Sequence, residues 1–175
     1  MNLLVIGGSN SKVSINRKLA QFAASLFENG NQDLVDYKQM DLPLYSTDKE
    51  LEIGIPDLVL DFANRIDTTD MIILSLAENN GSFNVGFKNL IDWTSRIRDR
   101  KIFAGKSIFL LSTSPGPRGG ATVLETALKL IPYWGGVVKD NFSLPSFYQH
   151  FKDENGIIDE TQLNILKTKI KQLNS

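Results

Sequence analysis

Residues 3–6 read LLVI, residues 7–8 are two glycines, and residues 9–16 read SNSKVSIN. A short, unbroken run of branched apolar residues is typical of a strand that is buried on both faces, as in a parallel sheet. The segment that follows carries apolar residues at helical spacing, namely Leu19, Phe22, Ala23 and Leu26. This part of the chain therefore predicts a strand, a polar loop and a helix that ends near residues 29–31, which read NGN.

The same alternation of apolar runs and helical stripes continues along the chain. Further strands are predicted at residues 34–37, 71–74 and 108–111, and a last one is centred on Val137-Val138. A helix is predicted over residues 56–66, beginning at proline. Three later helices are predicted from apolar residues at helical spacing. These residues are Phe87, Leu90, Ile91 and Thr94 in the first helix, Leu124, Ala127, Leu128 and Ile131 in the second, and Leu163, Leu166, Ile170 and Leu173 in the third. The pattern predicts an α/β fold with one domain over residues 1–175. We expect a doubly wound, five-stranded parallel sheet in the order 2-1-3-4-5, with helices on both faces.

Composition and charge exclude several kinds of partner. The chain has 175 residues, a net charge of −1 and no cysteine. A nearly neutral chain lacks the concentrated basic face that attracts nucleic acids and anionic membranes, so we expect neither partner. Because there is no cysteine and His150 is the only histidine, no metal site is expected. The apolar runs are too short for a secretory signal or a membrane span, so we expect a cytoplasmic protein without membrane insertion.

Three polar loops follow the first, third and fourth predicted strands, which are neighbours in this strand order and should bring their loops to one crevice. The first loop, residues 8–16, offers the hydroxyls of Ser9, Ser11 and Ser14 and the exposed N–H groups of a helix start. Such a place suits a phosphate dianion. The alternative is that Ser14 or Asn16 only caps the helix.

The second loop, residues 77–84, reads AENNGSFN. Gly81 would let its backbone approach the edge of a planar ligand and donate hydrogen bonds to it. An ordinary turn with a helix N-cap explains the same Asn and Ser content.

The third loop, residues 112–120, contains three glycines, two prolines and Arg118. Its composition indicates a shaped and rather stiff loop that could close one side of a ligand site. A simple connection from strand to helix with a solvated arginine is the alternative.

These loops together resemble the NADPH-dependent FMN reductase family, the flavodoxin-like flavoenzymes that include quinone, azo-dye and chromate reductases. Residues 8–16 (GSNSKVSIN) are similar to the family's GSLRKGSFN, and residues 77–93 (AENNGSFNVGFKNLIDW) to its PEYNxSIPGVLKNAIDW. Residues 112–120 (STSPGPRGG) match its Ser-Thr, Gly-rich segment. The resemblance implies a flavodoxin-like domain that binds FMN and uses NADPH or NADH.

The resemblance also implies which residues bind the cofactor. In this chain the family's arginine is Ser11, its tyrosine is Asn79, and its Pro-Gly pair is Asn84-Val85. The implied cofactor-binding residues are Ser9, Ser11, Ser14, Ile15 and Asn16 at the phosphate, Glu78, Asn79, Asn80, Gly81 and Ser82 beside the isoalloxazine ring, and Ser112, Thr113, Ser114, Gly116 and Gly119 on the pyrimidine side.

The expected function is two-electron transfer from NAD(P)H through bound flavin to a small acceptor such as a quinone. The cofactor carries this chemistry, so no side chain is assigned as a catalytic acid, base or nucleophile. The family resemblance favours a homodimer or homotetramer. Two alternatives stay open: a flavodoxin-type electron carrier, and a flavodoxin-like interaction protein that has lost FMN.

Aromatic residues outside the three loops are assigned to packing. Trp93 is expected in the core or at a subunit contact. The cluster of Phe142, Phe147, Tyr148 and Phe151 after the last strand is expected to cap the core or pack on a partner subunit, with a wall of the flavin pocket as the less favoured alternative.

Overall fold

Five parallel strands form the centre of the molecule in the computed structural model, which describes residues 1–35 and 41–174. The strand order is β2-β1-β3-β6-β7, which confirms the predicted order 2-1-3-4-5. The strands are β1 (Asn2–Gly8), β2 (Asn31–Val35), β3 (Met71–Leu76), β6 (Ser107–Thr113) and β7 (Val137–Leu144). Every neighbouring pair runs parallel, as expected for strands that are joined through helices.

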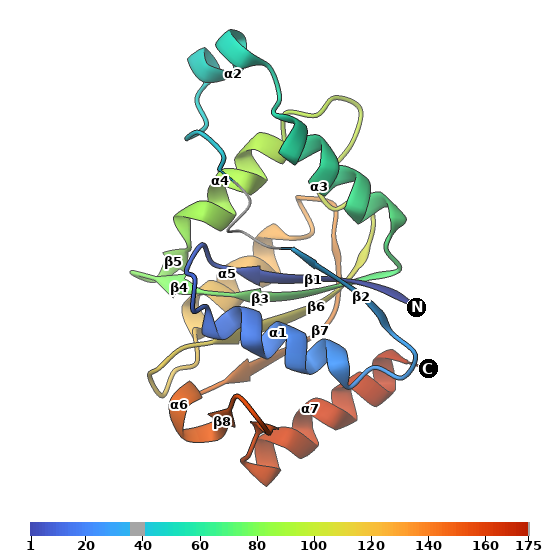
Figure 1. The fold of residues 1–175 in the computed structure, drawn as a ribbon, viewed down its shortest axis with the longest axis vertical. Helices are drawn as coiled ribbons and strands as arrows, with labels where there is room; N and C mark the ends of the chain where they lie inside the picture. The colour runs from blue at the N-terminus through green and yellow to red at the C-terminus, as the bar shows by residue number, and fades with distance from the viewer. Residues whose placement is uncertain (36–40, 175) are drawn as a thin grey trace.

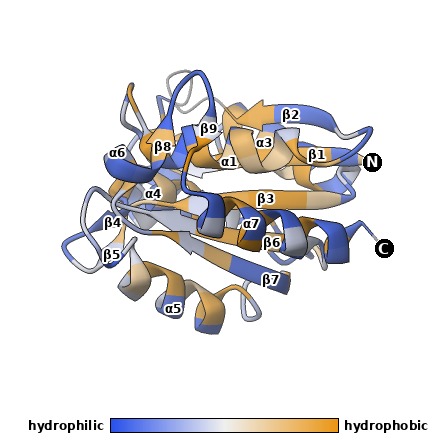
Figure 2. Ribbon diagram, turned by 90° about the horizontal axis from the view of Figure 1, so that it is seen from below, coloured by the Kyte–Doolittle hydropathy of each residue, from blue (hydrophilic) through white to orange (hydrophobic). Residues whose placement is uncertain are grey.

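Helices cover both faces of this sheet, as predicted (Figure 1). One face packs against α3 (Asp57–Thr68), α4 (Val85–Thr94) and α5 (Ala121–Leu130), and the other against α1 (Ile15–Ser25) and α7 (Glu160–Leu173). Successive residues of β1 alternate between the two cores: Leu4 and Ile6 face the first, and Leu3 and Val5 the second. Figure 2 shows β3 as a mainly hydrophobic strand through the middle, whereas α7 alternates hydrophilic and hydrophobic residues.

Two predicted strand positions need correction. The second strand begins at Asn31 and not at Leu34; of the predicted residues 34–37, the last two lie outside the described residues. Val137 and Val138 open the fifth strand and do not form its centre, because β7 continues to Leu144. Its later residues are less uniformly apolar, so the apolar run marked only one end of the strand.

Smaller elements occur where loops were predicted. Helix α2 (Thr47–Ile53) lies inside the predicted loop between the second strand and α3, has no buried residue and stands away from the sheet (Figure 1). The aromatic segment after β7 forms α6 (Phe147–His150) and a small hairpin of β8 (Phe151–Lys152) and β9 (Gly156–Ile157). Phe142, Phe147 and Phe151 are buried in the core on the α1 side, as the core-capping interpretation predicted. Tyr148 is 64% exposed.

The start of α1 lies very close to the end of β1, and this contact positions the first loop. A Cβ atom at Gly7 would lie 2.7 Å from the backbone nitrogen of Arg17. That separation is shorter than any normal van der Waals contact, so only glycine fits between the strand and the helix without movement of the backbone.

Among the described residues, no helix has both the length and the apolar character that crossing a membrane requires.

Because a Cβ atom at Gly7 would overlap the start of α1, replacing Gly7 by alanine should destabilise the fold. We expect Gly7→Ala to lower the free energy of unfolding by about 1–3 kcal/mol, the usual cost of overpacking a tight contact. Urea denaturation followed by circular dichroism measures the change. Gly116→Ala is the matched control, because its new Cβ would meet nothing nearer than the Ser114 hydroxyl at 3.9 Å. Equal stability of the two variants would contradict the close approach.

Candidate functional site

Three loops meet at the carboxyl edge of the sheet, where β1, β3 and β6 lie side by side. Side chains tie the loops to one another. Asn16 at the start of α1 bonds to Thr113 at the end of β6, and Asn84 bonds to Asn10 and Asn79. The three loops that the strand order was expected to bring together therefore lie at this edge of the sheet (Figure 1).

The first loop presents hydroxyl groups that accept hydrogen bonds but donate none within the described part of the chain. Ser9 Oγ accepts from the backbone N–H of Ser11 at 3.2 Å, and Ser11 Oγ accepts from Val13 at 3.3 Å. Ser14 Oγ accepts from the N–H of Arg17 at 3.1 Å and so caps α1. A hydroxyl can accept and donate at once, so three O–H protons stay available for a ligand.

The helix start adds further donors and a favourable field. The backbone N–H groups of Ile15 and Asn16 form no hydrogen bond with any described residue, as is usual in the first turn of a helix. The first turn of α1 carries no acidic residue, and Lys12 is exposed beside it. Hydroxyl donors, free N–H groups and the positive end of the helix dipole together suit an anion.

Asn16 has a structural role that sequence reasoning did not predict. Its side chain is only 2% exposed. The amide oxygen accepts from Ser75 Oγ at 2.8 Å and from the backbone N–H of Thr113 at 3.0 Å, while Nδ2 donates to the Thr113 carbonyl at 3.1 Å. The amide therefore joins α1 to the ends of β3 and β6.

The second loop is a tight hairpin. Strands β4 (Glu78–Asn79) and β5 (Ser82–Phe83) are antiparallel and are joined by Asn80 and Gly81, whose φ angles are 52° and 74°. Positive φ at both turn residues defines the type I′ geometry, for which Asn-Gly is the preferred sequence. The Asn-Gly pair could therefore have predicted this hairpin from the sequence. The backbone at Asn80 and Gly81 is exposed and can be approached by a ligand.

Glu78 fixes this hairpin to the neighbouring helix. One carboxylate oxygen of Glu78 accepts from the backbone N–H of Val123, in the first turn of α5, at 3.1 Å. A carboxylate is favoured at the amino end of a helix, where N–H groups are unpaired and the dipole is positive. The side chain of Glu78 thus positions the hairpin.

The hydroxyl groups of the third loop all donate to backbone carbonyls, two within the loop and one at the end of β7. Ser112 Oγ donates to the Gly119 carbonyl at 2.8 Å, Thr113 Oγ1 to the Leu144 carbonyl at 2.7 Å, and Ser114 Oγ to the Gly116 carbonyl at 3.2 Å. These side chains give the loop its shape, in contrast to the hydroxyls of the first loop. The side chain of Arg118 is exposed and donates to Thr122 Oγ1 at 2.9 Å.

Residues 43–45 are held against α4 by side chains of residues 88–93, which read KNLIDW. Asn89 Nδ2 and Trp93 Nε1 both donate to the Pro43 carbonyl, at 3.1 and 2.8 Å. Trp93 is fully buried, as predicted for a packing residue, and its ring contacts Tyr45 edge to face. Partial burial and a hydrogen bond to Glu50 raise the pKa of the Tyr45 phenol.

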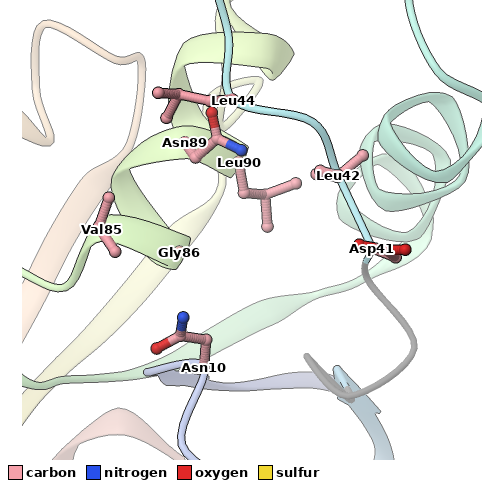
Figure 3. Close-up of a pocket in the computed structure, with 8 residues that line it drawn as sticks. All are labelled: Asn10, Asp41, Leu42, Leu44, Val85, Gly86, Asn89 and Leu90. Carbon is pink, nitrogen blue, oxygen red and sulfur yellow. The ribbon is translucent and has the colours of Figure 1, made fainter.

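A cleft of about 290 Å³ opens beside the first and second loops (Figure 3). Its walls come from the first loop, from residues 41–44 and from the first turns of α4. The lining residues are Asn10, Asp41, Leu42, Leu44, Val85, Gly86, Asn89 and Leu90. Its lining mixes apolar side chains with the polar groups of Asn10, Asp41 and Asn89, a combination that can hold a small organic ligand.

A doubly wound parallel sheet whose carboxyl edge carries a helix start suited to an anion is typical of the flavodoxin-like class of proteins. The chain belongs to the NADPH-dependent FMN reductase family, whose model matches residues 1–149. The family and fold expected from the sequence are both confirmed, and the family is one of oxidoreductases that depend on FMN and NAD(P)H.

Curated relatives agree with this family. A quinone reductase of Escherichia coli is 40% identical over 81 residues, which are 46% of this chain and 43% of that protein. The match thus spans less than half of either protein. An NADPH:quinone oxidoreductase of Arabidopsis thaliana is 28% identical over 99% of this chain and 88% of its own length.

Solved structures show the same fold. FerB of Paracoccus denitrificans, a flavoenzyme NAD(P)H:(acceptor) oxidoreductase, has a TM-score of 0.80 and 26% identity over 99% of this chain and 94% of its own. The apo form of the NADH:FMN oxidoreductase EMOB has a TM-score of 0.73 at 18% identity over 99% of this chain and 88% of its own.

The buried amide of Asn16 yields a stability prediction. Asn16→Ala removes the partner of Ser75 Oγ and of both backbone groups of Thr113. Unsatisfied buried polar groups are costly, so we expect the free energy of unfolding to fall by about 2–4 kcal/mol. Urea denaturation of flavin-free protein tests this. Asn64→Ala, at an exposed site on α3, should change stability by less than about 0.5 kcal/mol. Similar stability of both variants would show that the Asn16 amide is dispensable.

Proposed function

We propose that this protein binds FMN at the carboxyl edge of the sheet and oxidises NAD(P)H, passing two electrons to a small acceptor such as a quinone. The observation that carries the proposal is the set of unused donors in the first loop of a chain that belongs to the NADPH-dependent FMN reductase family.

The residues of the first loop fit a phosphate dianion. We assign the phosphate to the hydroxyls of Ser9, Ser11 and Ser14 and to the N–H groups of Ile15 and Asn16. Hydrogen bonds to a charged group contribute about 1.5–3 kcal/mol each, so this set compensates for the family's arginine, which is Ser11 here. The Asn16 side chain is already bonded to Ser75 and Thr113, so its contribution is assigned to its backbone.

The ring is assigned to the space between the hairpin and the third loop. Residues 78–82 would donate backbone hydrogen bonds to the ring edge, since the turn at Asn80 and Gly81 is exposed. The third loop, with Ser112, Thr113, Ser114, Gly116 and Gly119, would close the pyrimidine side. Asn79 stands where the family has tyrosine, so this wall is more open and more polar in this chain.

FMN would supply the chemistry by accepting hydride from NADPH or NADH and returning two electrons to the acceptor. The protein binds and orients the cofactor and excludes water, so no side chain is assigned an acid, base or nucleophilic role. A quinone is the proposed acceptor, since two relatives carry quinone in their names.

Assembly and location are also proposals. A homodimer or homotetramer is proposed from the family resemblance; Leu51 and Ile53 on α2 are 86% and 47% exposed and offer apolar surface for such a contact. A cytoplasmic location is proposed from the absence of cysteine and the short apolar runs.

Heating the purified protein and measuring released flavin is the first test. We expect yellow FMN in the supernatant, and binding of FMN by the flavin-free protein at least about tenfold tighter than riboflavin, because riboflavin lacks the phosphate. Steady NAD(P)H oxidation that depends on added quinone then separates a reductase from a flavodoxin-type carrier. Failure to bind FMN would support the alternative of an interaction protein, and bound FMN without turnover would support the carrier.

Ser14→Ala tests the phosphate assignment. Loss of one hydrogen bond to a charged group should weaken FMN binding by about 10- to 100-fold while the protein stays folded. Isothermal calorimetry measures the affinity, and circular dichroism the fold.

Ser46→Ala is the matched control for loss of a helix cap. Ser46 Oγ accepts from the N–H of Lys49 at 3.0 Å and caps α2, as Ser14 caps α1, but it lies outside the three loops. We expect unchanged FMN affinity in this variant. If Ser14→Ala lowers only the melting temperature, Ser14 is a plain helix cap.

A further inference from the structure

Asn84 occupies the junction between the hairpin and α4. It is the last residue before the helix and is 8% exposed. The family resemblance places proline, which has no side-chain amide, at this position. The sequence indicated at most an N-cap in this loop and no contact with the first loop.

The amide oxygen of Asn84 caps α4 and also contacts the first loop. It accepts from the backbone N–H groups of Gly86 at 3.0 Å and Phe87 at 3.4 Å. It also accepts from the N–H of Asn10 at 3.3 Å. Because three backbone donors face this oxygen, the orientation of the amide is fixed, and the NH₂ group must point to the opposite side.

The NH₂ group of Asn84 bonds to two loops at once. Nδ2 donates to Asn10 Oδ1 at 3.1 Å and to Asn79 Oδ1 at 3.0 Å. Asn10 belongs to the first loop and Asn79 to the hairpin strand β4. Both amide protons are therefore used, one for each loop, and the pair with Asn10 has two hydrogen bonds.

Close packing reinforces the link between Asn84 and the first loop. A Cβ atom at Gly86, in the first turn of α4, would lie 2.9 Å from Asn10 Cβ. Asn10 therefore rests against the helix that Asn84 caps. Two hydrogen bonds and a tight contact hold the loop in one position.

We propose that Asn84 is a positioning residue that fixes the separation between the first loop and the hairpin. This inference rests on the proposed function, in which the first loop holds the phosphate of FMN and the hairpin lies at the ring edge. A site whose two ends are held in place binds its ligand more tightly, because less ordering accompanies binding.

Asn84→Ser separates capping from positioning. Serine is as good an N-cap as asparagine, so α4 should remain capped. Its shorter side chain cannot reach both Asn10 and Asn79. We expect FMN affinity to fall by about tenfold, as for the loss of one to two hydrogen bonds. We also expect the midpoint potential of the bound flavin to shift, because the hairpin would no longer be held at the ring.

Asp159→Ser is the matched control for the exchange of a cap residue. Asp159 caps α7 by accepting from the N–H of Gln162 at 2.9 Å. FMN affinity and flavin potential should equal those of the wild type. All affinities are compared where circular dichroism shows each variant to be folded.

A double-mutant cycle tests whether Asn84 acts through Asn10. Asn10→Ala removes the partner on the first loop, so the combination with Asn84→Ser should weaken FMN binding by less than the product of the two single effects. Wild-type affinity in Asn84→Ser, or effects that multiply fully in the double variant, would overturn the proposal. If the wild-type protein binds no FMN, the proposed function fails and this inference fails with it.

Discussion

The buried amide of Asn16 is the interaction on which the geometry of the carboxyl edge depends. It joins the first turn of α1 to the ends of β3 and β6, through Ser75 Oγ and both backbone groups of Thr113. Strand ends in a parallel sheet leave polar backbone groups that must find partners when they are buried. One side chain from α1 supplies those partners and at the same time fixes where the helix begins.

A second set of polar side chains, all outside the sheet, holds the loops in place. Glu78 ties the hairpin to the start of α5, and Asn84 ties it to the first loop. Each side chain also satisfies backbone N–H groups in the first turn of a helix. Side chains thus satisfy backbone N–H groups at three helix starts of this site: Ser14 at α1, Asn84 at α4 and Glu78 at α5.

The first and third loops differ in how their hydroxyl groups are used. Three hydroxyls of the first loop accept from the backbone and keep their protons, while the hydroxyls of the third loop donate theirs to carbonyls. The two loops are similarly rich in serine and threonine, yet within the described part of the chain only the first has hydroxyl protons without an acceptor. The chain also has small polar residues where its family has arginine, tyrosine and proline, and two of them, Asn79 and Asn84, bond to each other.

Apolar periodicity along the chain predicted the alternation of strands and helices and the three polar loops, because both are local properties of the sequence. The strand order 2-1-3-4-5 was the expected order for this pattern, and the structure confirmed it. It also contained an Asn-Gly hairpin signal at residues 80–81, and the family resemblance pointed to the same loops. The roles of individual polar residues depend on contacts that form only in the folded chain. The partners of Asn16 are 59 and 97 residues away, and the bond from Asn84 to Asn10 spans 74 residues. Helix α2 has no buried residue, so its sequence lacks the apolar stripe from which a helix is predicted. Hydrogen bonds between distant segments produce no periodic pattern in the sequence, so they can be identified only in the folded structure.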